Sequence, residues 1–367
     1  MKSFPIIGLM SGTSIDGIDA SLIYSNGRKL KRTKFNLTEP YSRNTKNKIL
    51  KILEKPKSYL KNIKFLKELE KQITIEHAKV SKKIIGISKI KPKLIGLHGQ
   101  TIYHDGKSKI SIQLGDGKLL SDLLKTNVVY QFRKDDLLLG GEGAPIAPIY
   151  HKFLIKNLQL TLPSIILNIG GISNFTYWDG KNIFGFDVGP GNNLMDHFMR
   201  VKYNKNFDYN GNIAQKGTPD FELVKKYCSE IFFSKRPPKS LERISLIQNK
   251  YFKIITQLKP ADCLSTLIEI TIKSIELGMK FLPRKVKNIL IVGGGASNKY
   301  LVGKLRDKLN CNVYLPKDFN LNTHYIEAEL IGYLAARKTE KLTSTFPSTT
   351  GVKKSTILGT LINFKSN

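Results

Sequence analysis

The sequence predicts an α/β protein made of two copies of one unit with a cleft between them. Phe4–Tyr24 and Ser164–Trp178 share one plan, in which an apolar strand, a glycine-rich loop and an outgoing strand follow each other. A length of 367 residues allows two domains, each with its own core. The alternative is a chance likeness between two hairpins.

The domain boundary is expected where glycines gather after a strand. Gly140, Gly141 and Gly143 form a segment that backbone or ligand can approach closely. We therefore expect an N-terminal domain of residues 1–139 and a C-terminal domain of residues 140–367, with the last helix or tail a candidate to pack back on the first domain.

Composition excludes several classes of protein. Lys and Arg number 60 against 29 Asp and Glu, a formal charge of +31, so a nucleic-acid partner has to be considered. The lysines are spread along the whole chain, however, which is typical of a solvated surface. Three distant cysteines without a CxxC pair argue against disulfides or a zinc site. With no signal peptide and no membrane-length apolar run, we expect a cytoplasmic protein without nucleic-acid or membrane partners.

The first strand–loop–strand stretch offers groups that suit a nucleotide. Gly12 and Gly17 expose backbone N–H groups, Ser11, Thr13 and Ser14 carry hydroxyls, and Asp16 and Asp19 carry carboxylates. Amides and hydroxyls can hold phosphate, and carboxylates can hold Mg²⁺ through its waters. No lysine follows the second glycine and no helix follows the loop, so this is not a Walker A motif. A plain hairpin with an Asp-Gly turn remains the alternative.

Polar residues follow two further strands of the first half. Leu94–Leu97 runs into His98-Gly99-Gln100, and Asn127–Phe132 runs into Arg133, a candidate anion-binding fork. The alternatives are an ordinary loop with a buried histidine and a surface arginine. In the amphipathic helix predicted for Phe65–Ile85, His77 lies on the apolar stripe, and we interpret it as a satisfied, half-buried residue rather than a ligand.

The strand Ile183–Phe186 delivers Asp187, and a Gly189-Pro190-Gly191-Asn192 turn leads into a helix. Turn amides and a helix N-terminus attract phosphate, and a carboxylate beside them could take a proton or hold the waters of a metal ion. The alternative is that Asp187 caps the helix. Farther along, Thr218-Pro219 is expected to begin a helix that runs to about Phe233.

Two later segments are candidates for ligand contacts. The buried strand Asn288–Val292 ends in Gly293-Gly294-Gly295 and leads to Asn298, so that adenosine or phosphate could lie against backbone, although the GxGxxG spacing is missing. Lys239 is a candidate to face the cleft. Glu327 opens the last clear helix, where a carboxylate also stabilises the helix dipole.

The order of these motifs resembles the anhydro-N-acetylmuramic acid kinase family from Ile6 to the C-terminal region. The motifs are GLMSGTSIDGIDA, GLHGQTIYH, FRKDD, LLLGGEGAPIAP, LNIGGISNFT, GFDVGPGNNLMD, PPKS, STLIEIT, VGGGASN and EAELIGYLAAR. The resemblance implies two ribonuclease-H-like domains flanking an active-site cleft, the duplication found in the sugar kinase, actin and heat-shock ATPase superfamily. It also implies a homodimer and a role in recycling of cell-wall peptidoglycan.

The implied reaction uses ATP, Mg²⁺ and water to open the 1,6-anhydro ring and phosphorylate O6, giving N-acetylmuramate 6-phosphate and ADP. By resemblance Asp187 is the general base, Asp16 contacts the metal, and Gln100, Arg133 and Glu327 contact the sugar or the γ-phosphate. The residues implied to bind ATP are Gly12, Thr13, Ser14, Ile15, Asp16, Gly17, Ile18, Asp19, Gly189, Gly191, Asn192, Gly293, Gly294, Gly295 and Asn298.

The chain departs from the family pattern at three places. Glu142 replaces a glutamine, Lys134 and Asp135 replace arginines, and Leu241-Glu242 replaces a Thr-Gly pair. These changes leave open how the sugar and its lactyl carboxylate are recognised. A kinase of the same fold acting on another sugar is therefore the first alternative, and a basic nucleic-acid-binding protein is the second.

Overall fold

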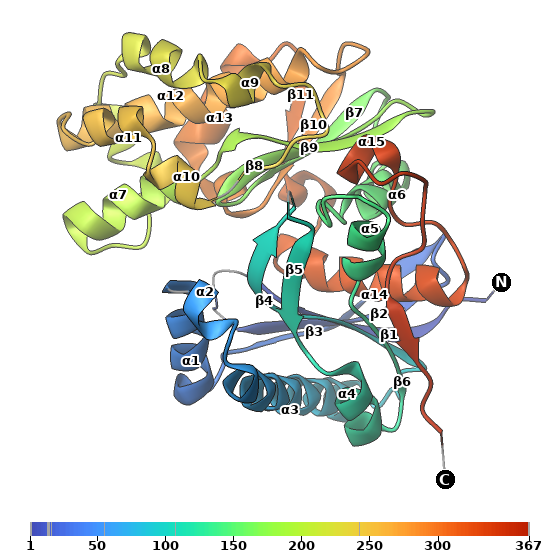
Figure 1. Cartoon of the computed structure of the whole chain (residues 1–367). Coiled ribbons are helices and arrows are strands. Elements are labelled where there is room, and N and C mark those ends of the chain that lie inside the picture. Colours follow the sequence, from blue (N-terminus) through green and yellow to red (C-terminus); the bar gives the residue numbers. More distant parts are fainter. Residues whose placement is uncertain are drawn as a thin grey trace. The chain divides into compact units, whose positions relative to one another are not determined.

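The computed structural model describes residues 2–12, 15, 17–54, 56–106, 108–241 and 243–365 (Figure 1). The chain forms two compact units, Met1–Phe153 with His324–Asn367, and Leu154–Thr323. The expected boundary followed residue 139, whereas these units divide after Phe153 and the last long helix belongs to the first unit.

The sheet of the first unit has the order β12-β6-β4-β1-β2-β3, and β5 pairs with β4. β1, β2 and β3 are antiparallel neighbours, whereas β4 and β6 run parallel to β1. The strands are β1 (Phe4–Ser11), β2 (Ile18–Ser25), β3 (Leu30–Glu39), β4 (Leu94–Asp105), β5 (Ile110–Leu114), β6 (Asn127–Tyr130) and β12 (Thr360–Ile362).

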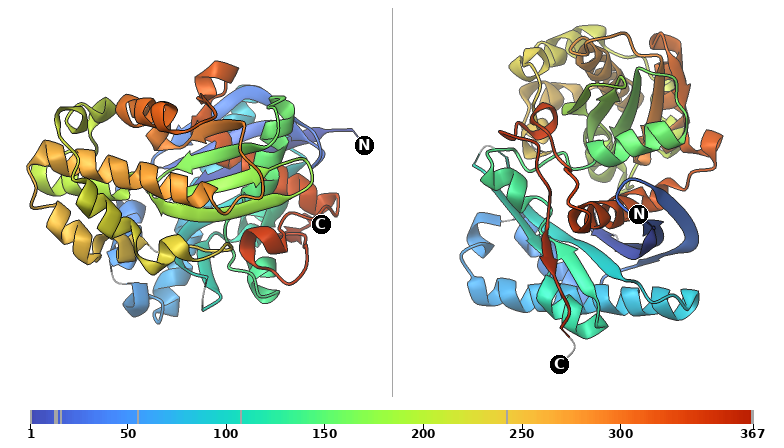
Figure 2. Two further views of the ribbon diagram at one scale, coloured as in Figure 1. Left: turned by 90° about the horizontal axis from the view of Figure 1, so that it is seen from above. Right: turned by 90° about the vertical axis from the view of Figure 1, so that its right-hand side faces the viewer.

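Helices cover both faces of this sheet, with α3 and α4 on one face and α14 on the other (Figures 1 and 2). α14 approaches closely because two strands carry glycine: a Cβ at Gly8 would lie 1.9 Å from the Ala328 carbonyl oxygen, and one at Gly96 2.6 Å from that of Ile331. The helices of this unit are α1 (Arg43–Glu54), α2 (Pro56–Tyr59), α3 (Ile63–Ser88), α4 (Gly117–Leu124), α5 (Lys134–Leu138), α6 (Pro148–Asn157, which continues past the division), α14 (Ile326–Thr339) and α15 (Pro347–Thr350).

The sheet of the second unit has the order β11-β10-β7-β8-β9. Its long helix α12 packs against β9 and carries a stripe of fully buried apolar residues that includes Leu264 and Ile275. The strands are β7 (Ser164–Ile169), β8 (Ile172–Trp178), β9 (Ile183–Pro190), β10 (Asn288–Val292) and β11 (Asn312–Tyr314). The helices are α7 (Asn193–Tyr203), α8 (Phe221–Cys228), α9 (Ile231–Ser234), α10 (Arg243–Ile247), α11 (Lys250–Ile255), α12 (Pro260–Met279) and α13 (Lys299–Lys308), with short 3₁₀ turns at Tyr209–Gly211, Ala214–Lys216, Gly294–Ser297, Pro316–Phe319 and Thr323–Tyr325.

The two sheets share a common arrangement of five strands, to which the first sheet adds β5 and β12 as antiparallel strands. In each, the first three strands form an antiparallel meander in the order third, second, first, and two more strands then add parallel to the first. The predicted duplication is therefore confirmed, and each unit is an α/β fold of the ribonuclease-H type.

The predicted start of the helix α8 was wrong. The helix expected at Thr218-Pro219 begins at Phe221 as α8 and ends at Cys228. Asp220 caps it by accepting the Leu223 N–H at 2.9 Å, while the Thr218 N–H donates to Asp262. The N-cap is therefore Asp220, two residues after the predicted Thr218.

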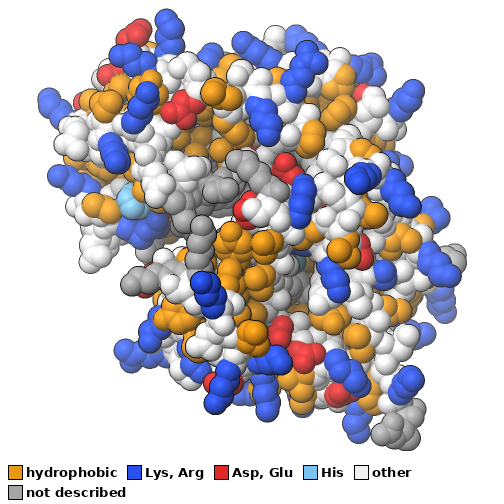
Figure 3. All heavy atoms as spheres, in the orientation of Figure 1, with side chains coloured by type: hydrophobic (Ala, Val, Ile, Leu, Met, Phe, Trp, Pro, Cys, Tyr) orange, Lys and Arg blue, Asp and Glu red, His pale blue; other side chains and the backbone are white. Residues whose placement is uncertain are grey.

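Among the described residues, no helix combines the length and the apolar character needed to cross a membrane. Figure 3 shows lysine and arginine side chains spread over the face that it presents, with acidic and apolar side chains between them.

Candidate active site

The β1–β2 loop is anchored in the core of the first unit. The Ile15 side chain is almost fully buried, and its φ of 59° is unusual for a β-branched residue, so packing holds this conformation in place. A Cβ at Gly17 would lie 2.5 Å from the Glu39 carbonyl oxygen, so the loop exit also requires glycine. The predicted phosphate and metal contacts Thr13, Ser14 and Asp16 lie outside the described residues.

Asp19, near the start of β2, is held by its neighbour strand. The Thr38 hydroxyl donates to Asp19 Oδ1 at 2.6 Å, and His324 Nε2 lies 3.4 Å from the same oxygen. The carboxylate is only partly exposed. Its position is therefore fixed before any ligand arrives.

Gln100 contacts the loop directly. Its side chain is fully buried, and Nε2 donates to the carbonyl oxygens of Gly12 at 3.1 Å and Thr101 at 3.2 Å. Within the described part of the chain, Oε1 has no hydrogen-bond partner. A buried polar atom without a partner is costly, so an acceptor is available here for a ligand or water hydrogen.

Arg133 is fixed by two acceptors. Its Nε–H donates to His98 Nε2 at 3.2 Å and its Nη1 to the Gly143 carbonyl oxygen at 2.9 Å. Burial lowers the pKa of Arg133 to about 10, so the guanidinium stays charged at neutral pH. Burial, helped by Arg133, lowers the pKa of His98 to about 3, so the neutral imidazole can accept this hydrogen bond. A buried histidine at this position was one of the alternatives from the sequence, but its role in supporting Arg133 was not predicted.

Glu327, in the first turn of α14, interacts electrostatically with Asp19 and Arg133. Desolvation raises the pKa of Glu327, the Asp19 carboxylate raises it further, and Arg133 lowers it. The structure thus brings Asp19, Gln100, Arg133 and Glu327 together with Gly12. β1 and β6 end at this edge of the sheet, where Gln100 of the longer strand β4 pairs with Ser11. Ligand sites in α/β proteins are typically found at such strand ends.

In the second unit, Asp187 lies within β9 and is bound by a distant connector. Its N–H donates to the Lys239 carbonyl oxygen at 3.0 Å, and its Oδ2 accepts the Leu241 N–H at 2.9 Å. The N-cap position of α7 belongs to Asn192. The connector therefore orients a half-buried carboxylate.

Lys239 secures this connector rather than extending into solvent. Its side chain is buried, Nζ donates to the Phe232 carbonyl oxygen at 3.0 Å, and the ammonium lies 4.5 Å and 4.6 Å from the ring centres of Phe232 and Phe281. Burial, with help from Lys235, lowers the pKa of Lys239 to about 8, while Asp187 opposes this shift.

The Gly189–Asn192 turn is packed against its own sheet. A Cβ at Gly189 would lie 2.4 Å from Ser274 Cβ. The N–H groups of Gly191 and Asn192 donate to the Gly171 and Gly170 carbonyl oxygens at 3.0 Å and 2.7 Å. These amides are therefore already engaged, and the turn positions the β7–β8 loop.

Gly293–Asn298 lies next to this turn. A Cβ at Gly294 would lie 3.4 Å from Asn192 Nδ2, and Gly293 needs a positive φ of 80°. Asn298 Oδ1 accepts the Leu301 N–H at 3.1 Å and caps α13. The predicted glycine segments of the second unit thus meet, but Asn298 uses its side-chain oxygen for the helix.

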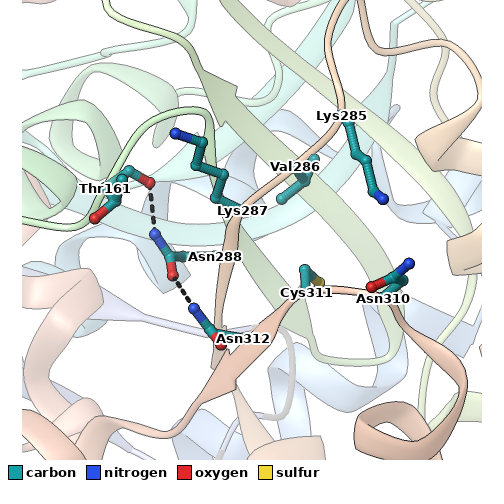
Figure 4. A pocket seen from close by; sticks show the side chains of 8 residues that line it. All are labelled: Thr161, Lys285, Val286, Lys287, Asn288, Asn310, Cys311 and Asn312. Atoms are coloured by element: carbon teal, nitrogen blue, oxygen red, sulfur yellow. Dashed lines mark hydrogen bonds between the residues drawn. The ribbon is translucent and has the colours of Figure 1, made fainter.

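A shallow pocket of about 410 Å³ lies elsewhere in the second unit (Figure 4). It is found at the amino ends of β10 and β11, where Asn288 donates to the Thr161 carbonyl oxygen and Asn312 to Asn288. None of the predicted site residues lines it.

Two ribonuclease-H-like units in one chain define the class of the sugar kinase, actin and heat-shock ATPase superfamily. Residues 5–364 match the family described as anhydro-N-acetylmuramic acid kinase. The chain belongs to this family.

Two curated relatives are similar to this chain over nearly its whole length. The anhydro-N-acetylmuramic acid kinase of Pelagibacter ubique is 38% identical over 98% of this chain and 99% of its own length. That of Zymomonas mobilis is 35% identical over 94% and 96%. Among solved structures, (R)-2-hydroxyglutaryl-CoA dehydratase component A of Acidaminococcus fermentans is similar with a TM-score of 0.44 and 12% identity over 91% of this chain and 98% of its own.

Proposed function

We propose that the protein is an ATP-dependent kinase that opens the 1,6-anhydro ring of anhydro-N-acetylmuramic acid with water and phosphorylates O6. The products are N-acetylmuramate 6-phosphate and ADP. The family match over residues 5–364 carries this proposal.

In the first unit, the Gly12–Asp19 loop is proposed to bind the ATP phosphates, with Ile15 and Ile18 contributing backbone. Arg133 supplies a charged guanidinium group whose orientation is fixed by hydrogen bonds to His98 and to the Gly143 carbonyl oxygen. Phosphoryl transfer depends mainly on such positioning and on charge stabilisation. The Gln100 Oε1 acceptor suits a sugar hydroxyl, and Glu327 suits a second one.

The donor set fits Mg²⁺. This ion commonly uses one or two carboxylates together with substrate phosphates, and the carboxylates of Asp19 and Glu327 interact electrostatically in the structure. The described residues hold no cluster of three His, Cys, Asp or Glu that would form an all-protein metal cage. Bound Mg²⁺ would neutralise phosphate charge, with Asp16 its predicted contact.

In the second unit, Asp187 is proposed to act as general base. It takes a proton from water, the water oxygen bonds to C1, and the C1–O6 bond breaks. O6 then takes the γ-phosphoryl group, and ADP leaves. The Leu241 N–H holds Oδ2 and so fixes the direction in which the carboxylate works.

Adenosine is proposed to lie along the glycine segments of the second unit, at Gly293–Gly295 with Gly189, Gly191, Asn192 and Asn298 as neighbours. Because the amides of Gly191 and Asn192 are engaged, we assign them a shaping role. Gly294 is exposed and lacks a side chain, so a flat ring could approach its backbone.

One departure from the family pattern has a structural explanation. Asp135 Oδ2 accepts the Gly359 N–H at 2.8 Å and so holds the C-terminal segment. At Leu241 the contact with Asp187 uses backbone, which any residue except proline could supply. Glu242 lies outside the described residues.

We also propose a cytoplasmic homodimer that acts in peptidoglycan recycling. The mass of the purified protein measured by light scattering tests the dimer. A mass corresponding to one chain over a wide concentration range would refute it.

The function is tested by ADP release with purified anhydro-N-acetylmuramic acid, followed by the mass of the product. A product that gains both water and a phosphoryl group is expected. A matched panel of simple hexoses is the control, and turnover of a hexose without turnover of the anhydro-sugar would replace the proposal with a kinase for another sugar.

A further inference from the structure

Three buried polar side chains form a hydrogen-bond chain whose middle member, Ser11, is the last residue of β1, next to the β1–β2 loop. The Tyr41 hydroxyl donates to Ser11 Oγ at 2.8 Å, Ser11 Oγ lies 3.0 Å from His77 Nε2, and His77 Nδ1 lies 2.8 Å from the Ile73 carbonyl oxygen. Ser11 and His77 are fully buried and Tyr41 nearly so. Polar groups of this kind are not needed for packing alone.

The direction of the chain follows from its last member. A carbonyl oxygen can only accept, so His77 carries its hydrogen on Nδ1 and accepts at Nε2. The Ser11 hydroxyl therefore donates to His77, and its oxygen is left to accept from Tyr41. Burial lowers the pKa of His77 to about 4 and raises the pKa of Tyr41 above its ordinary value, so both stay neutral at physiological pH.

This hydrogen-bond chain holds Ser11, the residue that precedes the β1–β2 loop. Ser11 is the last residue of β1, and the next residue, Gly12, is bound through its carbonyl oxygen by Gln100. On α3, the neighbour of His77 is Glu76, which accepts from the Ser42 N–H at 3.0 Å and so holds the segment that carries Tyr41. Helix α3 thus fixes the loop entry through Ser11 and the supporting segment through Glu76.

We propose that His77 and Tyr41 are positioning residues that set the entry of the Gly12–Asp19 loop for the ATP phosphates. This inference rests on the proposed function of that loop. The two side chains act through Ser11 and do not touch the nucleotide. Because the chain is neutral, it holds geometry and relays no proton.

The test measures binding of a non-hydrolysable ATP analogue with Mg²⁺ to the full-length protein by calorimetry, together with KM and kcat. His77→Leu should weaken binding about tenfold, the usual scale for losing a hydrogen bond to a buried group. Tyr41→Phe should weaken it about threefold. In both variants KM for ATP should rise, while kcat at saturating ATP stays within about twofold.

Two further variants separate positioning from general destabilisation. His77→Gln keeps an acceptor near the place of Nε2 and should restore most of the affinity. Thr74→Val changes another buried polar residue of α3, whose hydroxyl donates to Glu70 and accepts the Asp116 N–H. It should lower stability without changing ATP binding. KM for ATP in the wild type should also show no inflection between about pH 6 and pH 8, which a titrating histidine relay would produce.

Unchanged ATP binding in a folded His77→Leu protein would overturn the inference. Should that variant not fold, Tyr41→Phe and Ser11→Ala decide the matter by the same measurement. A wild-type protein that binds ATP but leaves the anhydro-sugar unchanged counts against the proposed function alone, because the binding comparison needs no sugar. A wild-type protein that does not bind ATP would overturn both.

Discussion

Replacing Asp187 with Asn separates the chemistry of this residue from its structural contacts. The backbone bond from the Asp187 N–H to the Lys239 carbonyl oxygen does not depend on the side chain. An Asn side-chain oxygen can still accept the Leu241 N–H, which now lies 2.9 Å from Oδ2. The variant should therefore fold and bind ATP like the wild type, but it cannot take a proton from water.

The expected loss is a factor of about 10² to 10⁴ in kcat, the usual contribution of a general base. This factor corresponds to about 3 to 5 kcal/mol in the activation free energy. The assay is ADP release at saturating ATP and anhydro-sugar, with ATP affinity measured by calorimetry.

Asp179→Asn is the matched control for this experiment. Asp179 also accepts backbone N–H groups, from Lys181 and Asn182, at the turn that precedes β9. Its replacement should change kcat by no more than about twofold. If Asp187→Asn retained near-normal turnover, or if both variants lost activity equally, Asp187 would not be the base.

Three further predictions concern buried groups. Asp136→Ala should lower the free energy of unfolding by about 3 kcal/mol or more, because the buried carboxylate accepts one N–H and two threonine hydroxyls that would lose their partner; a loss below about 1 kcal/mol in urea unfolding would contradict this. Burial lowers the pKa of His151 to about 3, below its unfolded value of about 6.5, so the stability tied to its neutral form is lost as the pH falls from about 6.5 toward 3. Between pH 7 and pH 5 this loss should be about 2 kcal/mol, and His151→Phe should remove it; an unchanged pH dependence of unfolding would refute the assignment. Lys239→Met keeps the apolar part of the side chain but loses the ammonium that donates to the Phe232 carbonyl oxygen. The contact between the Leu241 N–H and Asp187 should then loosen, so kcat should fall about tenfold while KM for ATP stays constant. Unchanged kcat would show that the segment bound to Asp187 does not need the Lys239 ammonium.

The sequence predicted the fold where local patterns carry it. Apolar strands that end in glycine-rich loops marked β1 and β7, and their repetition predicted the duplication that both sheets show. The predicted start of α8 was wrong because both Thr218 and Asp220 are residues that commonly cap a helix. The choice of Asp220 depends on the hydrogen bond from the Thr218 N–H to Asp262 of α12. That contact joins residues far apart in the sequence.

The candidate site was predictable to the same extent. Gln100 and Arg133 could be placed because they lie near the ends of the expected strands and such ends converge, although β4 continues past Gln100 to Asp105. The partners that orient them could not, since His98 meets Arg133, and Leu241 meets Asp187, only through the folded chain. No local pattern in the sequence encodes such pairs.

Glycine explains why motif-based assignment of the site has a limit. Gly8, Gly17 and Gly189 all follow the pattern of close approach, yet the atoms that approach them are Ala328, Glu39 and Ser274 of this same chain. A glycine-rich segment therefore indicates that other atoms approach the backbone closely. Only the structure shows whether those atoms belong to the protein or leave room for a ligand. For Gly191 it is the Gly170 carbonyl oxygen, whereas Gly294 is exposed, so the adenosine assignment rests more firmly on Gly294. By this reasoning, a bulky residue at Gly294 should weaken ATP binding without unfolding the protein, whereas any side chain at Gly191 should do both.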